Sequence, residues 1–150
     1  MGLSSALLPI KRGLFSLLSR SCLAIYSRAP IFGHLRAAVA VIRKDELFLV
    51  IDRSDARGYS FPGGLAFPWE GPEQAMRREV REETGLLIEK SWLLSQYRTE
   101  AEVPCILTVF GAEASGEMTE SWEGSPCWLS SAQIRPSLLP SQREIIDRVL

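Results

Sequence analysis

Residues 64–86 read GLAFPWEGPEQAMRREVREETGL, and the fold of the chain can be worked out from this stretch. Gly64 is followed after five residues by Glu70, and after seven more by the run REVREETGL at 78–86. Pro72 suits the first position of a helix, and Gly85 suits the left-handed residue that ends one. The sequence therefore predicts a helix from Pro72 to Thr84.

Three glutamates of this predicted helix share one face. Glu79, Glu82 and Glu83 stand at i, i+3 and i+4, and each helical residue turns by about 100°. Like charges at this spacing repel by roughly a few tenths of a kcal/mol per pair, so the cluster is sensible if a divalent cation lies among the carboxylates. Carboxylate oxygens suit Mg²⁺, with Mn²⁺ as the alternative. Such a cation polarises a phosphoryl oxygen and acidifies a bound water.

The neighbours of the three glutamates support the same interpretation. Arg78 can brace one glutamate through a bidentate ion pair and fix its rotamer. The glycines before the helix let the backbone come close to metal or phosphate. Met76 and Val80, at i and i+4, flank the acidic face and are expected to bury the helix against a sheet.

The alternative is an ordinary solvated helix, since REVREE consists of good helix formers. At a frequency of roughly 6–7% for each charged residue or glycine, seven fixed positions tested across the chain give odds on the order of one in a million. A solvated helix is therefore a poor explanation of the pattern.

The spacing G-x5-E-x7-R-E-U-x-E-E-x-G-U, in which U is a bulky aliphatic residue, resembles the acidic box of the Nudix hydrolase family. Val80 and Leu86 occupy the two U positions, and no fixed position departs. The resemblance implies an α/β/α sandwich around a mixed β-sheet. It also implies hydrolysis of the diphosphate bond of a nucleoside diphosphate linked to another moiety: a nucleotide, nucleotide sugar or dinucleotide type of substrate. A binding or regulatory module of the same fold without turnover is the alternative.

The resemblance also assigns expected roles to single residues. Glu79, Glu82 and Glu83 match the metal-binding glutamates, and Gly64 matches a ligand that uses its backbone carbonyl. Arg78 matches the arginine that orients a glutamate. Glu70 matches the first glutamate of the box, which is more often structural.

Two roles lie outside the box. Glu123, in the run SWEGSPCW, is the candidate general base, with Glu120 behind it. A plain surface acid is the other interpretation of Glu123. Arg53, Phe61 and Arg98 are candidate substrate-binding residues that could reach a phosphate or stack on a base, although each could equally be packing or surface.

The remaining elements are predicted from hydrophobic pattern and turn residues. Apolar, β-branched runs indicate strands, and the first two form a hairpin around Lys44-Asp45. Ser141 and Glu144 have the spacing of a capping box, which places a last helix from Ser141 onward. The predicted strands are 36–43, 46–53, 86–98, 104–113 and 126–130, and the helix is 141–150. Because they follow no regular βαβ order, a mixed sheet is expected.

Charge is divided unevenly along the chain. Up to Lys44 there are seven basic residues and no acidic one, whereas from Asp45 onward there are ten basic and eighteen acidic residues. A uniformly basic nucleic-acid binder would not look like this, so no specific nucleic acid is expected. Three cysteines without a CxxC pair argue against a disulfide framework and favour a reducing, cytoplasmic location.

The basic half contains an arm, residues 1–33, in front of a Nudix-like domain at 34–150. Within the arm, apolar residues at three- and four-residue spacing indicate an amphipathic helix, but Lys and Arg interrupt any run long enough to span a bilayer. Three uses of the arm stay open. It could pack on the domain or on a second subunit as a homodimer, make a peripheral membrane contact through residues 1–30, or target the chain to an organelle.

Overall fold

The computed structural model describes residues 35–55 and 57–149. Their strands and helices run in the order β1 (Leu35–Lys44), β2 (Leu47–Arg53), β3 (Tyr59–Ser60), β4 (Gly63–Leu65), α2 (Pro72–Thr84), β5 (Leu87–Thr99), β6 (Cys105–Ser115), β7 (Gly124–Ser130), α3 (Ser131–Ile134), a 3-10 turn (Arg135–Ser137) and α4 (Pro140–Val149).

The strands form a mixed seven-stranded sheet with β1 near its centre. β1 runs parallel to β6 over Leu35–Ile42 and antiparallel to both β2 and β4. β5 is antiparallel to β6 and lies outside it, whereas β3 and β7 both pair with β2. One parallel pair among antiparallel ones confirms the predicted mixed sheet.

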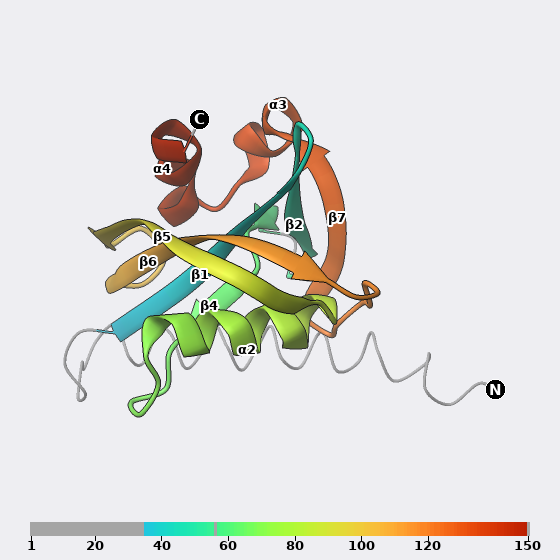
Figure 1. The fold of residues 1–150 in the computed structure, drawn as a ribbon. Coiled ribbons are helices and arrows are strands. Elements are labelled where there is room, and N and C mark those ends of the chain that lie inside the picture. The colour runs from blue at the N-terminus through green and yellow to red at the C-terminus, as the bar shows by residue number, and fades with distance from the viewer. Residues whose placement is uncertain (1–34, 56, 150) are drawn as a thin grey trace.

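Alternating side chains of β1 build two cores, one on each face of the sheet. Val39 and Val41 face the core that includes Ile145 and Ile146 of α4. Ala38 and Ala40 face the other core, which includes Met76 and Val80 of α2. Because neighbouring residues of a strand point to opposite faces, one strand serves both layers. Figure 1 shows α2 below the sheet and α4 above it, which confirms the α/β/α sandwich.

The helix of the acidic box begins and ends at the predicted residues. It runs from Pro72 to Thr84, and Gly85 follows in the left-handed conformation at φ 77°. The N–H of Gly85 donates to the carbonyl of Arg81 at 3.0 Å, which closes the last turn. Met76 and Val80 are fully buried, so the helix contacts the sheet along the predicted face.

The last helix begins one residue earlier than predicted, and Ser141 does not cap it. α4 starts at Pro140, so Ser141 lies inside the first turn, where its N–H donates to Glu102 at 3.1 Å. Glu144 binds Arg148 one turn later at 2.6 Å and makes no capping box. Pro140 could have marked this start, because proline favours the first turn of a helix. Two short strands, β3 and β4, also lie between the second predicted strand and α2, where no strand was predicted.

The described residues do not include the arm at 1–33, which contains Cys22, or the following His34. The helix predicted for the arm and its three possible uses therefore stay predictions. Among the helices of residues 35–55 and 57–149, none is both long and apolar enough to cross a membrane. Cys105 and Cys127 are both free thiols.

Met76→Ala is expected to lower the free energy of unfolding by about 2–5 kcal/mol, because it opens a cavity beneath α2. Met118→Ala is the matched control, since Met118 is 38% exposed whereas Met76 is fully buried. The control should change stability by no more than about 0.5 kcal/mol. Urea unfolding measures both, and equal effects would contradict the packing of α2 described above.

Candidate active site

An acidic cleft of about 460 Å³ opens beside the N-terminal half of β1. Its walls include β1, the end of β2, β4, α2, the start of β6, the loop before β7 and the start of α4. The charged and glycine residues that line it are Arg53, Arg57, Gly63, Gly64, Glu79, Glu83, Glu102 and Glu123. Five of the predicted site residues therefore line the same cleft, although they are up to seventy positions apart in the sequence.

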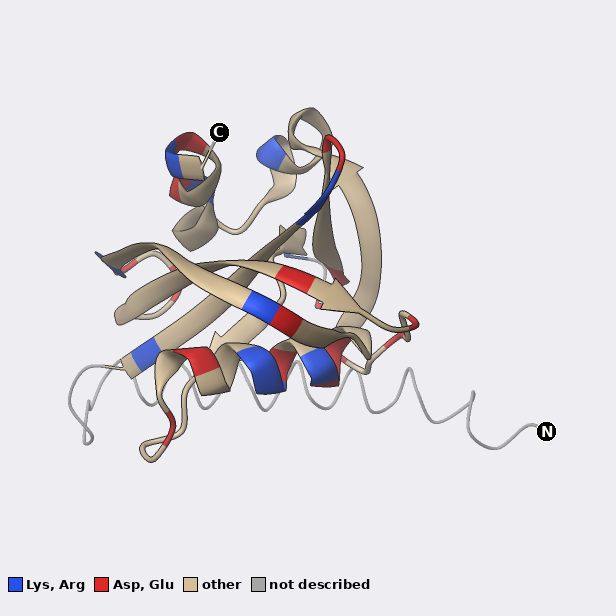
Figure 2. Ribbon diagram, viewed as in Figure 1, with Lys and Arg blue, Asp and Glu red and all other residues tan. Residues whose placement is uncertain are grey.

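Arg78, on α2, forms ion pairs with three glutamates of the acidic box. Its Nε and Nη2 bind the two carboxylate oxygens of Glu70 at 2.8 and 3.0 Å, and Nη2 also donates to the carbonyl of Leu65. Its Nη1 lies 2.7 Å from Glu79 and 3.3 Å from Glu82. The bidentate pair predicted for Arg78 thus forms with Glu70, and Arg78 holds Glu79 and Glu82 through single contacts. Figure 2 shows how basic and acidic residues alternate along α2.

Two glycines of β4 position the buried ends of the helix glutamates. The N–H of Gly63 donates to Glu83 Oε2 at 2.8 Å, and Glu83 is 3% exposed. A Cβ on Gly64 would lie 2.7 Å from Glu79 Cδ and Oε1, so the carboxylate of Glu79 rests against the Gly64 backbone. The β4 backbone therefore approaches the acidic helix closely, because no larger residue at 64 would leave room for this contact. The predicted approach of these glycines to metal or phosphate stays a prediction.

Glu83 and Glu123 both line the cleft, and their carboxyl groups interact. Burial raises the pKa of both carboxyl groups, and the charge of Glu123 raises the pKa of Glu83 further. A hydrogen bond joins their side chains. The loop that carries Glu123 is anchored by Ser54, whose N–H and hydroxyl both donate to the Glu123 carbonyl at 2.9 Å.

The donor set fits a hard divalent cation in its chemistry. Glu79, Glu83, Glu123 and the Gly64 backbone offer only oxygen atoms, which Mg²⁺ and Mn²⁺ prefer. Burial raises the pKa of Glu79 despite its bond to Arg78, so a cation here would relieve buried negative charge. Glu82 differs, because its side chain is 58% exposed and turned to Arg78. In the part of the chain that the structure describes, no three acidic, His or Cys side chains already converge as an ion-binding group.

Arg53 enters the cleft from the end of β2 and is held there by a second ion-pair cluster. Its Nε and Nη2 donate to the two oxygens of Asp55 at 3.1 and 2.8 Å. Arg57 Nε donates to the same carboxylate at 2.6 Å. Two guanidinium groups therefore share one carboxylate whose side chain is only 5% exposed, which places cationic charge in the same cleft as the glutamates.

Two predicted substrate-binding residues do not reach the cleft. Phe61 is 1% exposed and packs edge-on against Phe48 with ring centroids 6.1 Å apart, so the prediction that it stacks on a base is wrong. Its side chain belongs to the core because β3 turns it toward the face that α4 covers. Arg98 is not among the residues that line the cleft and pairs on the surface with Glu100 at 3.2 Å.

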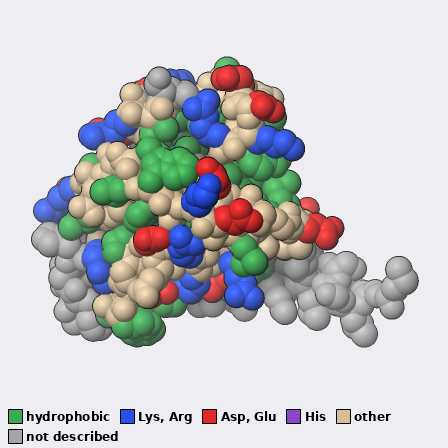
Figure 3. Space-filling view, viewed as in Figure 1, with side chains coloured by type: hydrophobic (Ala, Val, Ile, Leu, Met, Phe, Trp, Pro, Cys, Tyr) green, Lys and Arg blue, Asp and Glu red, His purple; other side chains and the backbone are tan. Residues whose placement is uncertain are grey.

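Phe67 lines the cleft and was not predicted. It stacks on Trp69 with centroids 5.1 Å apart, and the guanidinium of Arg78 lies 4.3 Å from its ring centre. Both aromatic residues are exposed, at 45% and 78%. Figure 3 shows hydrophobic side chains at the surface over the loop between β4 and α2, where these residues lie. The run FPWEG could have signalled them, since exposed aromatic residues within a polar loop are uncommon.

Comparisons with known proteins agree with this geometry. A model of the NUDIX domain matches residues 33–149. A MutT-like protein of Streptomyces ambofaciens is 32% identical over 108 residues, which are 71% of this chain and 70% of that protein. The protein YtkD of Bacillus subtilis (strain 168), named as a candidate 8-oxo-dGTP diphosphatase, is 45% identical over 51 residues, 34% of this chain and 32% of its own length.

Solved structures show the same fold. A candidate nudix hydrolase family member from Chromobacterium violaceum has a TM-score of 0.66 at 30% identity and covers 78% of this chain and 77% of its own. A MutT protein from Methanosarcina mazei Go1 has a TM-score of 0.64 at 26% identity, over 77% of this chain and 91% of its own. The fold and the acidic cleft define a hydrolase of the Nudix type. The chain belongs to the Nudix family, whose members generally use divalent metals, and it is a Nudix hydrolase.

Asp55→Asn is expected to lower the free energy of unfolding at pH 7 by about 3 kcal/mol, because it leaves two guanidinium groups without their buried carboxylate. Burial alone would raise the pKa of Asp55, but Arg53 and Arg57 outweigh it and hold the pKa well below its usual value. The stabilisation by Asp55 is therefore fully present above a pH of about 4, the pKa of this carboxyl group in the unfolded chain. It is lost as the pH falls from there toward the lower pKa of Asp55 in the folded protein.

Urea unfolding of wild type and Asp55→Asn at pH 7, and at steps below pH 4, tests this expectation. The two free energies should converge as the pH falls. Asp147→Asn is the control, because its ion pair with Arg135 is exposed at 60% and contributes at most about 1 kcal/mol. A constant difference between wild type and Asp55→Asn at every pH would contradict the electrostatic explanation.

Proposed function

We propose that the chain hydrolyses the diphosphate bond of a nucleoside diphosphate linked to another moiety, with Mg²⁺, or Mn²⁺ in its place. The observation that carries this proposal is the group of carboxylates that line the cleft, the buried Glu83 and the half-buried Glu79 and Glu123. Glu79 and Glu83 also contact the β4 backbone. Such a group costs folding energy unless a cation binds it.

The metal-binding residues of the proposal are Glu79, Glu82, Glu83 and the carbonyl of Gly64. When bound, the cation would neutralise phosphate charge and lower the pKa of a water. Arg78 acts as the positioning residue, because its Nη1 contacts the carboxylates of both Glu79 and Glu82. Glu82 would turn from Arg78 toward the cleft, which its exposure permits. Glu70 occupies the other side of the guanidinium and keeps it in place.

Glu123 is the proposed general base. Its side chain lines the cleft, and its backbone carbonyl accepts a hydrogen bond from the hydroxyl of Ser54, which holds the loop in place. Burial raises the pKa of its carboxyl group, which brings it closer to the value that a base needs at neutral pH. It would take a proton from the attacking water, while Arg53 binds a phosphate oxygen of the substrate. YtkD, which is named as a candidate 8-oxo-dGTP diphosphatase, supports a nucleotide substrate.

Purified full-length protein with Mg²⁺ should release phosphate or a monophosphate from at least one member of a panel of nucleoside triphosphates, nucleotide sugars and dinucleotides. Glu79→Gln, Glu82→Gln and Glu83→Gln should each abolish this release. Glu73→Gln is the matched control, because it changes a carboxylate on the same helix that binds Arg77 outside the cleft. Full activity in Glu82→Gln, or loss in the control alone, would refute the metal site.

Glu123→Gln should lower kcat by about 10²- to 10⁴-fold, as expected for removal of a general base. The base works only when it is ionised, and its pKa is raised. Wild-type kcat should therefore increase with pH through this raised pKa, and the variant should lose that dependence. Steady-state kinetics from pH 5 to 9 with saturating Mg²⁺ measures both quantities. An unchanged pH profile in the variant would exclude Glu123 as the base.

A further inference from the structure

The loop between β4 and α2 holds an exposed aromatic pair, Phe67 and Trp69, whose ring planes lie within 17° of parallel. Trp69 is 78% exposed, more than any other large hydrophobic side chain of residues 35–55 and 57–149. Figure 1 shows this loop projecting beyond the first turn of α2. The aromatic pair therefore stands out at the surface of the domain.

Hydrogen bonds hold the loop in this position. Arg36 Nη2 donates to the carbonyls of Phe67 and Pro68 at 3.4 and 3.3 Å. Glu70 Oε2 accepts the N–H of Phe67 at 3.0 Å, and Arg78 binds both oxygens of the same carboxylate. The backbone under the aromatic pair is thus ordered before any partner arrives. Preorganised apolar groups lose little conformational entropy on binding, which suits a docking surface.

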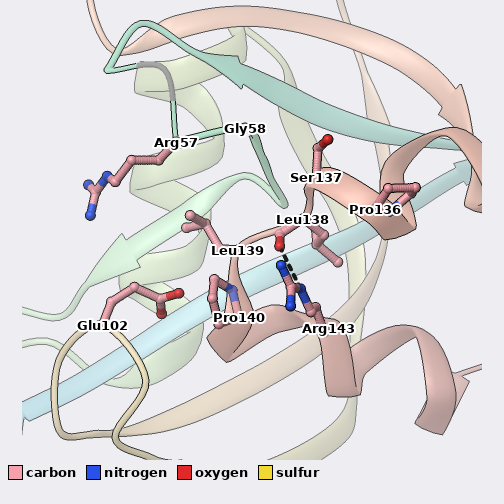
Figure 4. Close-up of a pocket in the computed structure, with 9 residues that line it drawn as sticks. All are labelled: Arg57, Gly58, Glu102, Pro136, Ser137, Leu138, Leu139, Pro140 and Arg143. Atoms are coloured by element: carbon pink, nitrogen blue, oxygen red, sulfur yellow. Dashed lines mark hydrogen bonds between the residues drawn. The ribbon is translucent and has the colours of Figure 1, made fainter.

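A ligand inside the cleft would leave Trp69 uncovered. Phe67 lines the cleft, but Trp69 is not among the residues that line it. Trp69 is also absent from the lining of a neighbouring cavity of about 480 Å³ at the start of α4, which Figure 4 shows. That cavity shares Arg57, Glu102 and Leu139 with the cleft, so the two hollows adjoin each other. A partner that covers Trp69 must therefore lie outside both.

The chain that leads into the domain runs beside this loop. Ala37 of β1 lies opposite Leu65 of β4, and the N–H of Ala66 donates to the carbonyl of Arg36 at 2.8 Å. The arm at 1–33 ends just before β1. It therefore joins the domain at the edge that carries the aromatic pair.

This edge of the chain is cationic. Residues 1–30 contain no acidic side chain and four basic ones, Lys11, Arg12, Arg20 and Arg28. Arg36 adds a guanidinium at the loop itself. The loop run AFPWEG has one acidic residue, Glu70, and Arg78 neutralises it. A negatively charged partner would therefore meet cations and exposed aromatic rings at the same edge.

We propose that the aromatic pair and the basic arm together bind an anionic membrane surface. Tryptophan favours the boundary between lipid and water, because its ring is apolar and its N–H can stay hydrated. Each basic residue close to an anionic bilayer strengthens binding about fivefold. Stable attachment generally needs two signals, and this edge supplies an apolar one and an electrostatic one. The competing partners of Trp69 are a second copy of the chain and a distal part of the substrate.

Three full-length variants separate the two contributions. Trp69→Ala removes the exposed ring. The arm variant replaces all four basic residues of 1–30 with glutamine. Trp92→Ala is the matched control, because Trp92 is 48% exposed but lines a hollow with Val149 of α4, on the other face of the sheet from α2. Urea unfolding verifies that each variant is folded.

Vesicle flotation measures binding to phosphatidylcholine alone and to phosphatidylcholine with about 30 mol% phosphatidylserine. We expect the wild type to bind the anionic vesicles at least tenfold more tightly than the neutral ones, and added salt to weaken this binding. Trp69→Ala should weaken binding to anionic vesicles about tenfold, because it removes buried apolar area. The arm variant should lose the preference for anionic vesicles, and Trp92→Ala should bind as the wild type does. Equal binding to both kinds of vesicle, or unchanged binding by Trp69→Ala, would overturn the proposal.

Fluorescence shows whether the ring of Trp69 enters the bilayer. Lipids brominated on their acyl chains quench the tryptophans that they contact. Trp69→Ala should therefore lose most of the quenching that the wild type shows, even where enough lipid is present to keep it bound. Undiminished quenching in this variant would exclude Trp69 as a membrane anchor.

Two further measurements identify the competing partners. Analytical ultracentrifugation without vesicles should give one monomer mass for the wild type and for Trp69→Ala. A wild-type dimer that the variant dissociates would assign the aromatic pair to a second copy of the chain and overturn the membrane role. A raised KM for nucleotides in Trp69→Ala, with vesicle binding unchanged, would assign it to the substrate instead. Vesicle binding needs no turnover, so this proposal can fail while the proposed function holds, and the reverse.

Discussion

The site depends on the guanidinium of Arg78, which lies among carboxylates that would otherwise repel one another. It binds Glu70 through two hydrogen bonds and contacts Glu79 and Glu82 through a third nitrogen. A fifth contact, to the carbonyl of Leu65, ties the same group to β4. One side chain therefore compensates the acidic helix and fixes the loop before it to the sheet. Lysine could not replace it, because an ammonium group lacks the planar set of donors that these contacts use.

The small residues on one face of β1 let this acidic helix come close to the sheet. Ala38 and Ala40 face α2, whereas the opposite face carries the larger Val39 and Val41. The gap between helix and strands is narrow enough that Gly64 has no room for a side chain beside Glu79. Burial of the carboxylates follows from this close packing, and burial raises the pKa of Glu79 and Glu83.

Two side chains that line the cleft are held by one short piece of backbone. Phe61 and Gly63 use their N–H groups to hold Gln142 from α4 and Glu83 from α2. The two helices lie on opposite faces of the sheet, yet each contributes a side chain to the same cleft. The backbone of residues 61–63 thus sets the relative position of Glu83 and Gln142, and any change in its path would move both side chains.

The sequence by itself determined the local features, because helix and turn signals act over a few residues. Pro72 and Gly85 predicted both ends of α2, and the spacing of Glu79, Glu82 and Glu83 predicted one shared face. Glu79 and Glu83 line the cleft, whereas Glu82 is exposed beside Arg78. The strand pair around Lys44-Asp45 and the mixed sheet also followed from patterns of neighbouring residues.

Only the tertiary structure decided which distant groups meet. It placed Phe61 in the core, paired Arg78 bidentately with Glu70, and brought Gln142 into the cleft through a bond to a residue 81 positions away. Gln142 carries no signal in the sequence, since glutamine is an ordinary residue of a surface helix. The physical reason is that a hydrogen bond depends on distance in space and on burial. Both are set by how the sheet and the two helix layers pack, and neither is encoded in the spacing of residues along the chain.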